Sequence, residues 1–207
     1  VNVIGVMEND VIDDQGLREI EAIAAAGGGV SQVVYAQALS QTVQMVTRKA
    51  MATTIQGVVN NELKQILGKS ASIEELPPDK RGEVIEVVDE LSETSSLEVL
   101  VLVDTSASMK HKLPTVKESL IDLSISLNAR VGKNKFSVFI FPGKKHDVEK
   151  LLDWTPKLES LSKVFSKLSP RGITPTGPAI SEAIRYFSKK RSLRSLLSDD
   201  EQYYKES

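Results

Sequence analysis

The chain has 207 residues, which fits one domain of ordinary size and is short for two. Hydrophobic residues make up 41% and charged residues 26%, which indicates a globular core and excludes a disordered chain. A net charge of −2 argues against a nucleic-acid partner, and no apolar run approaches the roughly 20 residues that span a bilayer, so we expect no membrane partner either. The absence of cysteine excludes disulfides, thiolate metal sites and cysteine nucleophiles, and it agrees with a cytoplasmic location.

The first third of the chain alternates strand and helix patterns. The β-branched run Val1–Val6 predicts a buried strand. Apolar residues then recur at helical spacing, and Gly27–Gly29 is expected to end that helix, because glycine readily adopts the left-handed cap. Val33–Tyr35 predicts a short strand. A helical stripe follows over residues 37–67, and Gly57 is a candidate for dividing it.

The middle of the chain contains the most apolar segment. Lys69–Lys80 is predicted to be a linker, since Pro77 and Pro78 cannot continue a helix, and a short helix is expected over Glu83–Leu91. The near-continuous hydrophobicity of Leu97–Val103 predicts a central parallel strand that is covered on both faces.

The last part of the chain repeats the alternation of strands and helices. A strong amphipathic helix is predicted over Lys112–Val131. A buried strand over Phe136–Phe141 follows, and Val148–Trp154 is expected to run back beside it. Two further helices, around residues 158–168 and 180–187, flank the loop Ser169–Gly177. This order predicts an α/β fold with helices on both faces of the sheet.

Side chains with hard oxygen donors follow directly on the most apolar strand. Asp104, Ser106 and Ser108 alternate with Thr105 and Ala107, and we expect the alternate spacing to bring the first three to one point while the other two turn away. Open α/β sheets bind their ligands at the carboxyl ends of strands. Carboxylate and hydroxyl oxygens suit Mg²⁺ or Mn²⁺ rather than a soft metal.

The strand–DxSxS–helix pattern resembles the opening of the metal-ion-dependent adhesion site of von Willebrand factor A (vWA) domains, in detail those of cytoplasmic bacterial proteins. The resemblance implies a three-layer, Rossmann-like, mostly parallel sheet. It also implies a threonine ligand in a glycine-containing loop downstream, for which Thr174 is the choice and Thr176 the alternative. The metal would be Mg²⁺ or Mn²⁺, and its open coordination position would bind an exposed Asp or Glu of a partner protein.

The order of parts differs from an ordinary vWA domain. Residues 1–67 resemble the C-terminal half of the fold, and residues 97–190 resemble the N-terminal half with the DxSxS motif. Residues 68–96 would be a linker with a short helix, and residues 191–207 a charged, solvated tail. The resemblance therefore implies a circular permutation, with two tandem, cut domains as the alternative that the chain length disfavours.

One family element has no match in the chain. vWA domains carry a strand that ends in an acidic metal ligand just before the strand that Val1–Val6 resembles. Because the chain opens in mid-strand without methionine, we expect a fragment of a longer protein that lacks this strand; translation from another start codon is the alternative. Asp10, Asp13 and Asp14 follow the wrong strand and do not substitute for the ligand.

The same residues also fit functions other than a metal-dependent binding module. Asp104, Ser106 or Ser108, and His111 supply the residue types of a hydrolytic triad, but the chain lacks a G-x-S-x-G motif and His111 is too close in sequence. The same Asp and Ser could merely cap the next helix. No phosphate-binding loop is present, so we expect no enzyme, although a vWA-type regulatory subunit of an ATPase or kinase system is an alternative.

Overall fold

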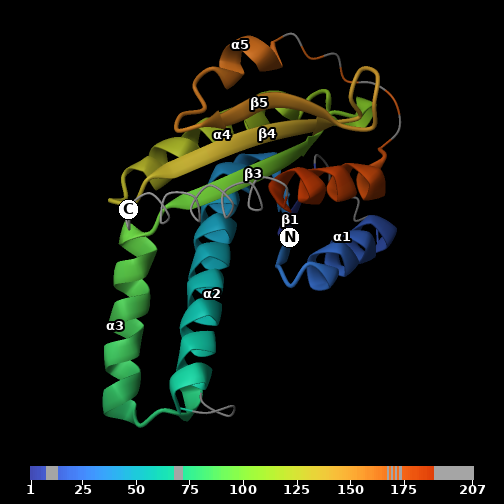
Figure 1. Ribbon diagram of the computed structural model, residues 1–207. Coiled ribbons are helices and arrows are strands. Elements are labelled where there is room, and N and C mark those ends of the chain that lie inside the picture. The colour runs from blue at the N-terminus through green and yellow to red at the C-terminus, as the bar shows by residue number, and fades with distance from the viewer. Residues whose placement is uncertain are drawn as a thin grey trace, which may run out of the picture. The chain divides into compact units, whose positions relative to one another are not determined.

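The computed structural model of the protein describes residues 1–7, 14–67, 72–166, 168, 170, 172 and 174–188. The chain divides into two compact units, each assembled from separate stretches of sequence. Unit 1 comprises Val1–Leu97, Pro114–Lys135 and Pro156–Glu159, and unit 2 comprises Glu98–Leu113, Phe136–Thr155 and Ser160–Ser207. Strands and helices alternate along the chain, which confirms the predicted α/β class (Figure 1).

Unit 1 contains a small parallel sheet. Its strands are β1 (Val3–Met7) and β2 (Ser31–Tyr35), and helix α1 (Asp14–Ala26) lies between them in sequence. The crossover helix contacts both strands, as expected where parallel strands are joined by a helix. The predicted glycine turn after α1 is confirmed, because Gly28 has a φ of 60°, a conformation that few other residues adopt.

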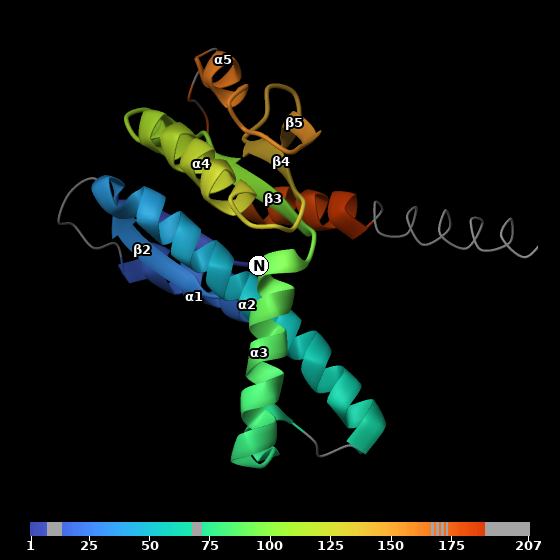
Figure 2. The same ribbon diagram turned by 90° about the vertical axis from the view of Figure 1, so that its left-hand side faces the viewer.

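Two long helices of unit 1 contact each other, α2 (Leu39–Leu67) and α3 (Pro78–Thr94); they run next to each other in Figure 1 and cross at an angle in the view of Figure 2. α2 passes through Gly57 without interruption, so the division expected there is wrong. α3 begins earlier than Glu83, because proline at the start of a helix lacks only an N–H that has no helical acceptor. Short 3-10 turns precede these helices at Ala36–Ala38 and Ile73–Glu75.

Side-chain hydrogen bonds join α2 to helix α4 (Leu113–Asn128) within unit 1. Ser40 Oγ donates to Asp122 Oδ2 at 2.8 Å, and Arg48 Nη2 donates to Ser126 Oγ at 3.0 Å. The first part of the chain therefore does not form a globule by itself but shares a unit with the helix after the DxSxS motif. The circular permutation stays a prediction.

A buried arginine closes unit 1 between the end of α3 and the turn after α4. Arg130 is 8% exposed. Its guanidinium donates to Ser92 O at 2.7 Å, to Ser95 O at 3.0 Å and to Asn134 Oδ1 at 2.8 Å. These bonds satisfy main-chain carbonyls at the end of a helix, where no helical donor remains.

The mixed sheet that carries the candidate site has the order β3–β4–β5, with β3 at Leu97–Asp104, β4 at Asn134–Phe141 and β5 at Glu149–Thr155. Leu97 N donates to Lys133 O and Thr105 N to Phe141 O, and both bonds join residues equally far apart in sequence, so β3 and β4 run parallel. β5 pairs with β4 in the antiparallel sense, which confirms the predicted return strand.

Among the described residues the hydrogen-bonded ladders are β1–β2 and β3–β4–β5. Within the second ladder, β3 is not the central strand that its hydrophobicity predicted. β4 lies between β3 and β5 and is the more completely buried strand, whereas most of β3 is half-buried. The hydrophobicity of a strand reflects its contacts with helices as well as with other strands. It therefore does not identify which strand of a sheet is hydrogen-bonded to a neighbouring strand on both sides.

Short helical elements complete unit 2. Helix α5 spans Leu161–Phe165, and residues 176–188 form a further helix whose Ala179 and Ala183 are buried. The predictions for Asp10, Asp13 and the tail 191–207 fall outside the described residues. Among the described helices, none combines the length and apolar character needed to cross a membrane.

Candidate functional site

The Asp104–Ser108 loop, which continues from β3, brings three of the four predicted ligands together. Asp104 Oδ1 accepts a hydrogen bond from Ser106 N at 2.7 Å, the short local bond by which an aspartate turns the chain two residues on. Ser106 Oγ lies 3.1 Å from Ser108 Oγ. Ser106 is 3% exposed, Asp104 is half-buried and Ser108 is exposed, so the group extends from the end of the strand to the surface.

The hydroxyl of Ser106 does not cap the helical turn that follows. Residues Ala107–Met109 form a 3-10 turn with Ser106 at its N-terminal cap position, and no side-chain capping bond is made there. The main-chain carbonyl of Ser106 accepts from Met109 N at 3.0 Å instead. Helix capping therefore does not explain this serine, whose hydroxyl pairs with that of Ser108.

Thr105 has an anchoring role that the sequence pattern did not reveal. It turns away from the ligand group, as predicted, and is only 5% exposed. Its main-chain N donates to Phe141 O at 2.7 Å, and its Oγ1 lies 3.2 Å from Phe141 O and 3.4 Å from Pro142 O. The threonine thus fastens the Asp104–Ser108 loop to the end of β4.

The fourth predicted ligand lies on a separate loop. Thr174 is exposed, and its carbonyl accepts at 3.0 Å from the main-chain N of Thr176, the first residue of helix 176–188. Gly172, two residues before Thr174, has a φ of 78°, and a Cβ built there would lie 3.5 Å from Pro142 Cγ. Gly172 therefore lies near Pro142, whose carbonyl oxygen is 3.4 Å from Thr105 Oγ1. Among the described residues, no hydrogen bond joins the Thr174 hydroxyl to the Asp104–Ser108 loop. Thr176, the alternative ligand, is half-buried within the helix.

Ionisable side chains near the Asp104–Ser108 loop are those that could hold a metal ion or act as a base. The described part of the chain contains no cluster of three or more His, Asp or Glu residues that could hold an ion by those side chains alone. His111 and His146 are both exposed, as expected for surface histidines. The oxygen partner of Ser106 Oγ is the hydroxyl of Ser108 and not an imidazole.

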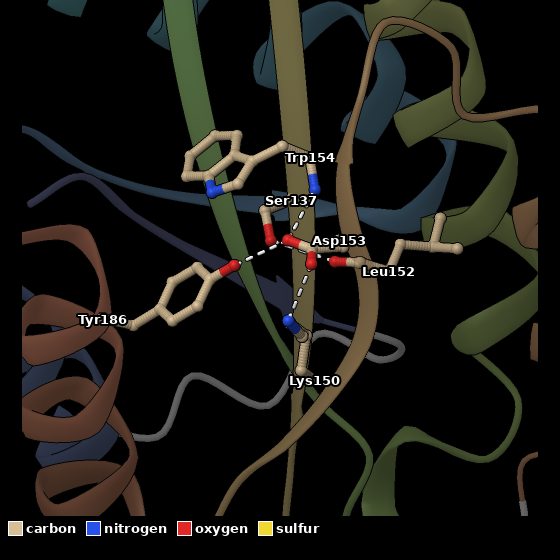
Figure 3. A network of polar contacts seen from close by, with 6 residues as sticks. All are labelled: Ser137, Lys150, Leu152, Asp153, Trp154 and Tyr186. Carbon is tan, nitrogen blue, oxygen red and sulfur yellow. Dashed lines mark hydrogen bonds and ion pairs between the residues drawn. The ribbon is translucent and has the colours of Figure 1, made fainter. Parts of the chain in front are cut away.

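A polar network on β5, which sequence reasoning missed, holds the helix that follows Thr174 (Figure 3). Asp153 accepts from the Tyr186 hydroxyl at 2.6 Å, from Lys150 Nζ at 2.9 Å and from Trp154 N at 2.9 Å. The Tyr186 hydrogen bond, followed by those from Lys150 and Trp154, lowers the pKa of Asp153 to about 2. Burial and the bond to Asp153 raise the pKa of Tyr186. No local pattern links residues 33 positions apart, so the sequence held no signal for this pair.

The chain was compared with known families, proteins and solved structures. No protein-family model matches it. It is similar to the uncharacterized protein YabS of Bacillus subtilis (strain 168), with 68% identity over 206 residues that cover 100% of this chain and 84% of YabS. It is also similar to a crystal structure of an uncharacterized protein from Alicyclobacillus acidocaldarius subsp. acidocaldarius DSM 446, with 39% identity and a TM-score of 0.83 over 93% of this chain and 82% of the other. Both similarities extend over almost the whole chain and therefore over both units.

Proposed function

We propose that this chain, which belongs to the protein family of Bacillus subtilis YabS, is a metal-dependent protein-binding module rather than an enzyme. Asp104, Ser106, Ser108 and Thr174 would hold Mg²⁺ or Mn²⁺, and the partner protein would present an exposed Asp or Glu. The observation that carries the proposal is the Asp104–Ser108 loop at the end of β3, in which the hydroxyls of Ser106 and Ser108 lie 3.1 Å apart and the Asp104 carboxylate accepts from Ser106 N.

The donor set fits the proposed ion in chemistry and spacing. All four side chains offer hard oxygen donors, the type that Mg²⁺ and Mn²⁺ prefer. Two oxygens bound to Mg²⁺ at neighbouring octahedral positions, each about 2.0–2.1 Å from the ion, stand about 2.9 Å apart. Ser106 Oγ and Ser108 Oγ are 3.1 Å apart, so both can bind one ion with little movement.

The charge of the site explains why a partner's carboxylate would be recognised. Three of the four proposed ligands are neutral hydroxyls and only Asp104 carries a negative charge, so a divalent ion there would remain positive and attract an acidic side chain. Two hydrogen bonds hold the ligands in place. Ser106 N donates to the Asp104 carboxylate, and the Thr105 hydroxyl donates to the carbonyl of Phe141.

We also propose that the α/β fold is a circularly permuted, three-layer vWA-type domain. The parallel pair β3–β4, its antiparallel neighbour β5 and the DxSxS loop at the carboxyl end of β3 support this assignment. The parallel strands β1 and β2, joined by a helix, have the strand–helix–strand order of the C-terminal half that residues 1–67 resemble. The cytoplasmic location and the regulatory-subunit alternative stay predictions.

Thermal unfolding with and without Mg²⁺ tests the metal site. A metal that binds only the folded state stabilises it by about 2.7 kcal/mol at 100 times its dissociation constant, which for a chain of this size raises Tm by about 5–10 °C. Asp104→Ala should abolish this rise because it removes the one anionic ligand. Asp89→Ala is the matched control, because it removes an exposed aspartate of α3 and should leave the rise intact. An equal rise in the Asp104 variant would contradict the proposal.

A further inference from the structure

The loop that carries Thr174 is continuous with a helix. Thr176 N donates to the carbonyl of Thr174 at 3.0 Å, and Ala179 N donates to the carbonyl of Pro175 at 3.0 Å. Thr174 therefore lies two residues before the first residue of helix 176–188 and is joined to it through the main chain, so a displacement of this end of the helix displaces the threonine. Its exposed side chain makes no hydrogen bond of its own to the Asp104–Ser108 loop among the described residues.

The other end of the helix is fastened to the sheet by three residues that we call the latch, namely Lys150, Asp153 and Tyr186. The Tyr186 hydroxyl donates to Asp153 Oδ1, and Lys150 Nζ donates to Asp153 Oδ2 (Figure 3). The 2.6 Å length of the tyrosine bond is typical of a hydroxyl bound to an ionised carboxylate. The lowered pKa of Asp153 keeps this acceptor ionised at every pH near neutrality.

Aromatic packing orients the latch. The Tyr186 ring lies 4.9 Å from the Phe139 ring of β4, centroid to centroid, and is stacked at 6.4 Å with an interplanar angle of 9° against Trp154 of β5. Trp154 also meets the edge of Phe187 at 5.7 Å. Lys150 Nζ is 5.2 Å from the centre of the Tyr186 ring, within the range of a cation–π contact.

The buried face of the helix between these two ends is made of small side chains, Ala179 and Ala183. Side chains this small make fewer contacts than large ones, so they contribute less to fixing the position of the helix. The large, directional contacts that define its position are those of Tyr186 and Phe187, at the end remote from Thr174.

We propose that Tyr186 and Asp153 are positioning residues for the metal site, because their bond sets where helix 176–188 lies on β5 and hence where Thr174 stands. The inference rests on the proposed function. An ion that draws Thr174 toward Ser106 and Ser108 would move helix 176–188 and so change the packing around Tyr186. Because linked equilibria are reciprocal, removing the Tyr186–Asp153 bond should lower the affinity of the site for the ion.

Trp154 allows a direct test, because it is the single tryptophan of the chain and lies against both Tyr186 and Phe187. Titration of the whole chain with Mg²⁺ should change the emission of Trp154 with the same midpoint as Mg²⁺ binding measured by calorimetry. Tyr186→Phe keeps the ring but removes the hydroxyl, and it should raise the dissociation constant for Mg²⁺ about fivefold, the lower end of typical coupling between sites. Asp153→Asn retains an acceptor for the Tyr186 hydroxyl and should raise it less.

A tyrosine of the other unit supplies the matched control. Tyr35→Phe makes the same chemical change on β2 and should leave both Mg²⁺ affinity and the emission response unchanged. Mg²⁺ binding without any change in Trp154 emission, together with an unaltered affinity in Tyr186→Phe, would overturn the positioning role while leaving the metal site in place. A wild-type chain that binds no Mg²⁺ in the calorimeter would overturn the proposed function and this inference together.

Discussion

Replacing Thr105 with valine tests whether the candidate site is held in place by the end of β4. The change keeps the β-branched shape and removes one hydroxyl, which lies 3.2 Å from Phe141 O and 3.4 Å from Pro142 O. Phe141 O keeps its 2.7 Å bond from the main-chain N of residue 105, so the loss leaves that carbonyl satisfied. The burial of Thr105 raises the expected cost and the length of both hydroxyl contacts lowers it, which together place it near the middle of the usual range for one hydrogen bond, about 1 kcal/mol.

This cost can be measured by urea denaturation, with Thr54→Val as the control. Thr54 bonds the carbonyl of Ala50 at an exposed position of α2, and its replacement should change stability by less than about 0.5 kcal/mol. Because the hydroxyl of Thr105 anchors the Asp104–Ser108 loop, the valine variant should also bind Mg²⁺ more weakly. Unchanged stability and unchanged Mg²⁺ affinity would refute the anchoring role.

Three further outcomes follow from the geometry. Asp153 has a pKa lowered from 3.8 to about 2, so its stabilising bonds are complete above about pH 4 and are lost as the pH falls through about 2. The Asp153 side chain is 65% exposed, so solvent screens its interactions. The difference in unfolding free energy between wild type and Asp153→Asn should therefore decrease from pH 6 to pH 2.5, by no more than about 1 kcal/mol. An increase of this difference at pH 2.5 would contradict the direction of the pKa shift. Arg130→Met should lower the unfolding free energy by about 2–4 kcal/mol, because it removes the Arg130 donors from the part-buried carbonyls of Ser92 and Ser95. A loss below about 1 kcal/mol would show that these bonds are dispensable. His111→Ala should leave Mg²⁺ affinity unchanged, whereas ester hydrolysis that this variant abolishes and EDTA does not would establish the hydrolase alternative.

The elements that periodicity predicted are largely those observed. The β-branched and apolar runs before Met7, Asp104 and Phe141 are strands, and the antiparallel return strand after the Pro142–Gly143 turn was also predicted. These predictions succeeded because each depends on local residue pattern alone. The contacts of the Asp104 carboxylate with Ser106 N and of Ser106 Oγ with Ser108 Oγ are local in the same way, since residues of one short loop need no distant partner to meet, and their role as metal ligands stays a prediction.

The predictions that failed depended on competition between effects. Two prolines suggested a linker, but proline at a helix start is tolerated, and the pair marks the beginning of α3. Gly57 costs helix stability of roughly 1 kcal/mol and is nevertheless carried within α2, since neighbouring residues can supply more than that. The division into two sheets and the Tyr186–Asp153 bond are long-range facts, and neither has a signature in the spacing of residues.

Locating the ion itself tests the central claim most directly. Crystals of the chain grown with Mn²⁺ would show the metal by its anomalous scattering. We expect one strong peak within about 2.5 Å of Ser106 Oγ and Ser108 Oγ, with the oxygens of Asp104 and Thr174 turned toward it, and weakened by competition with Mg²⁺. A chain that remains without a peak at this loop under saturating Mn²⁺, or that binds the ion only elsewhere, would contradict the assignment of a metal-dependent binding site.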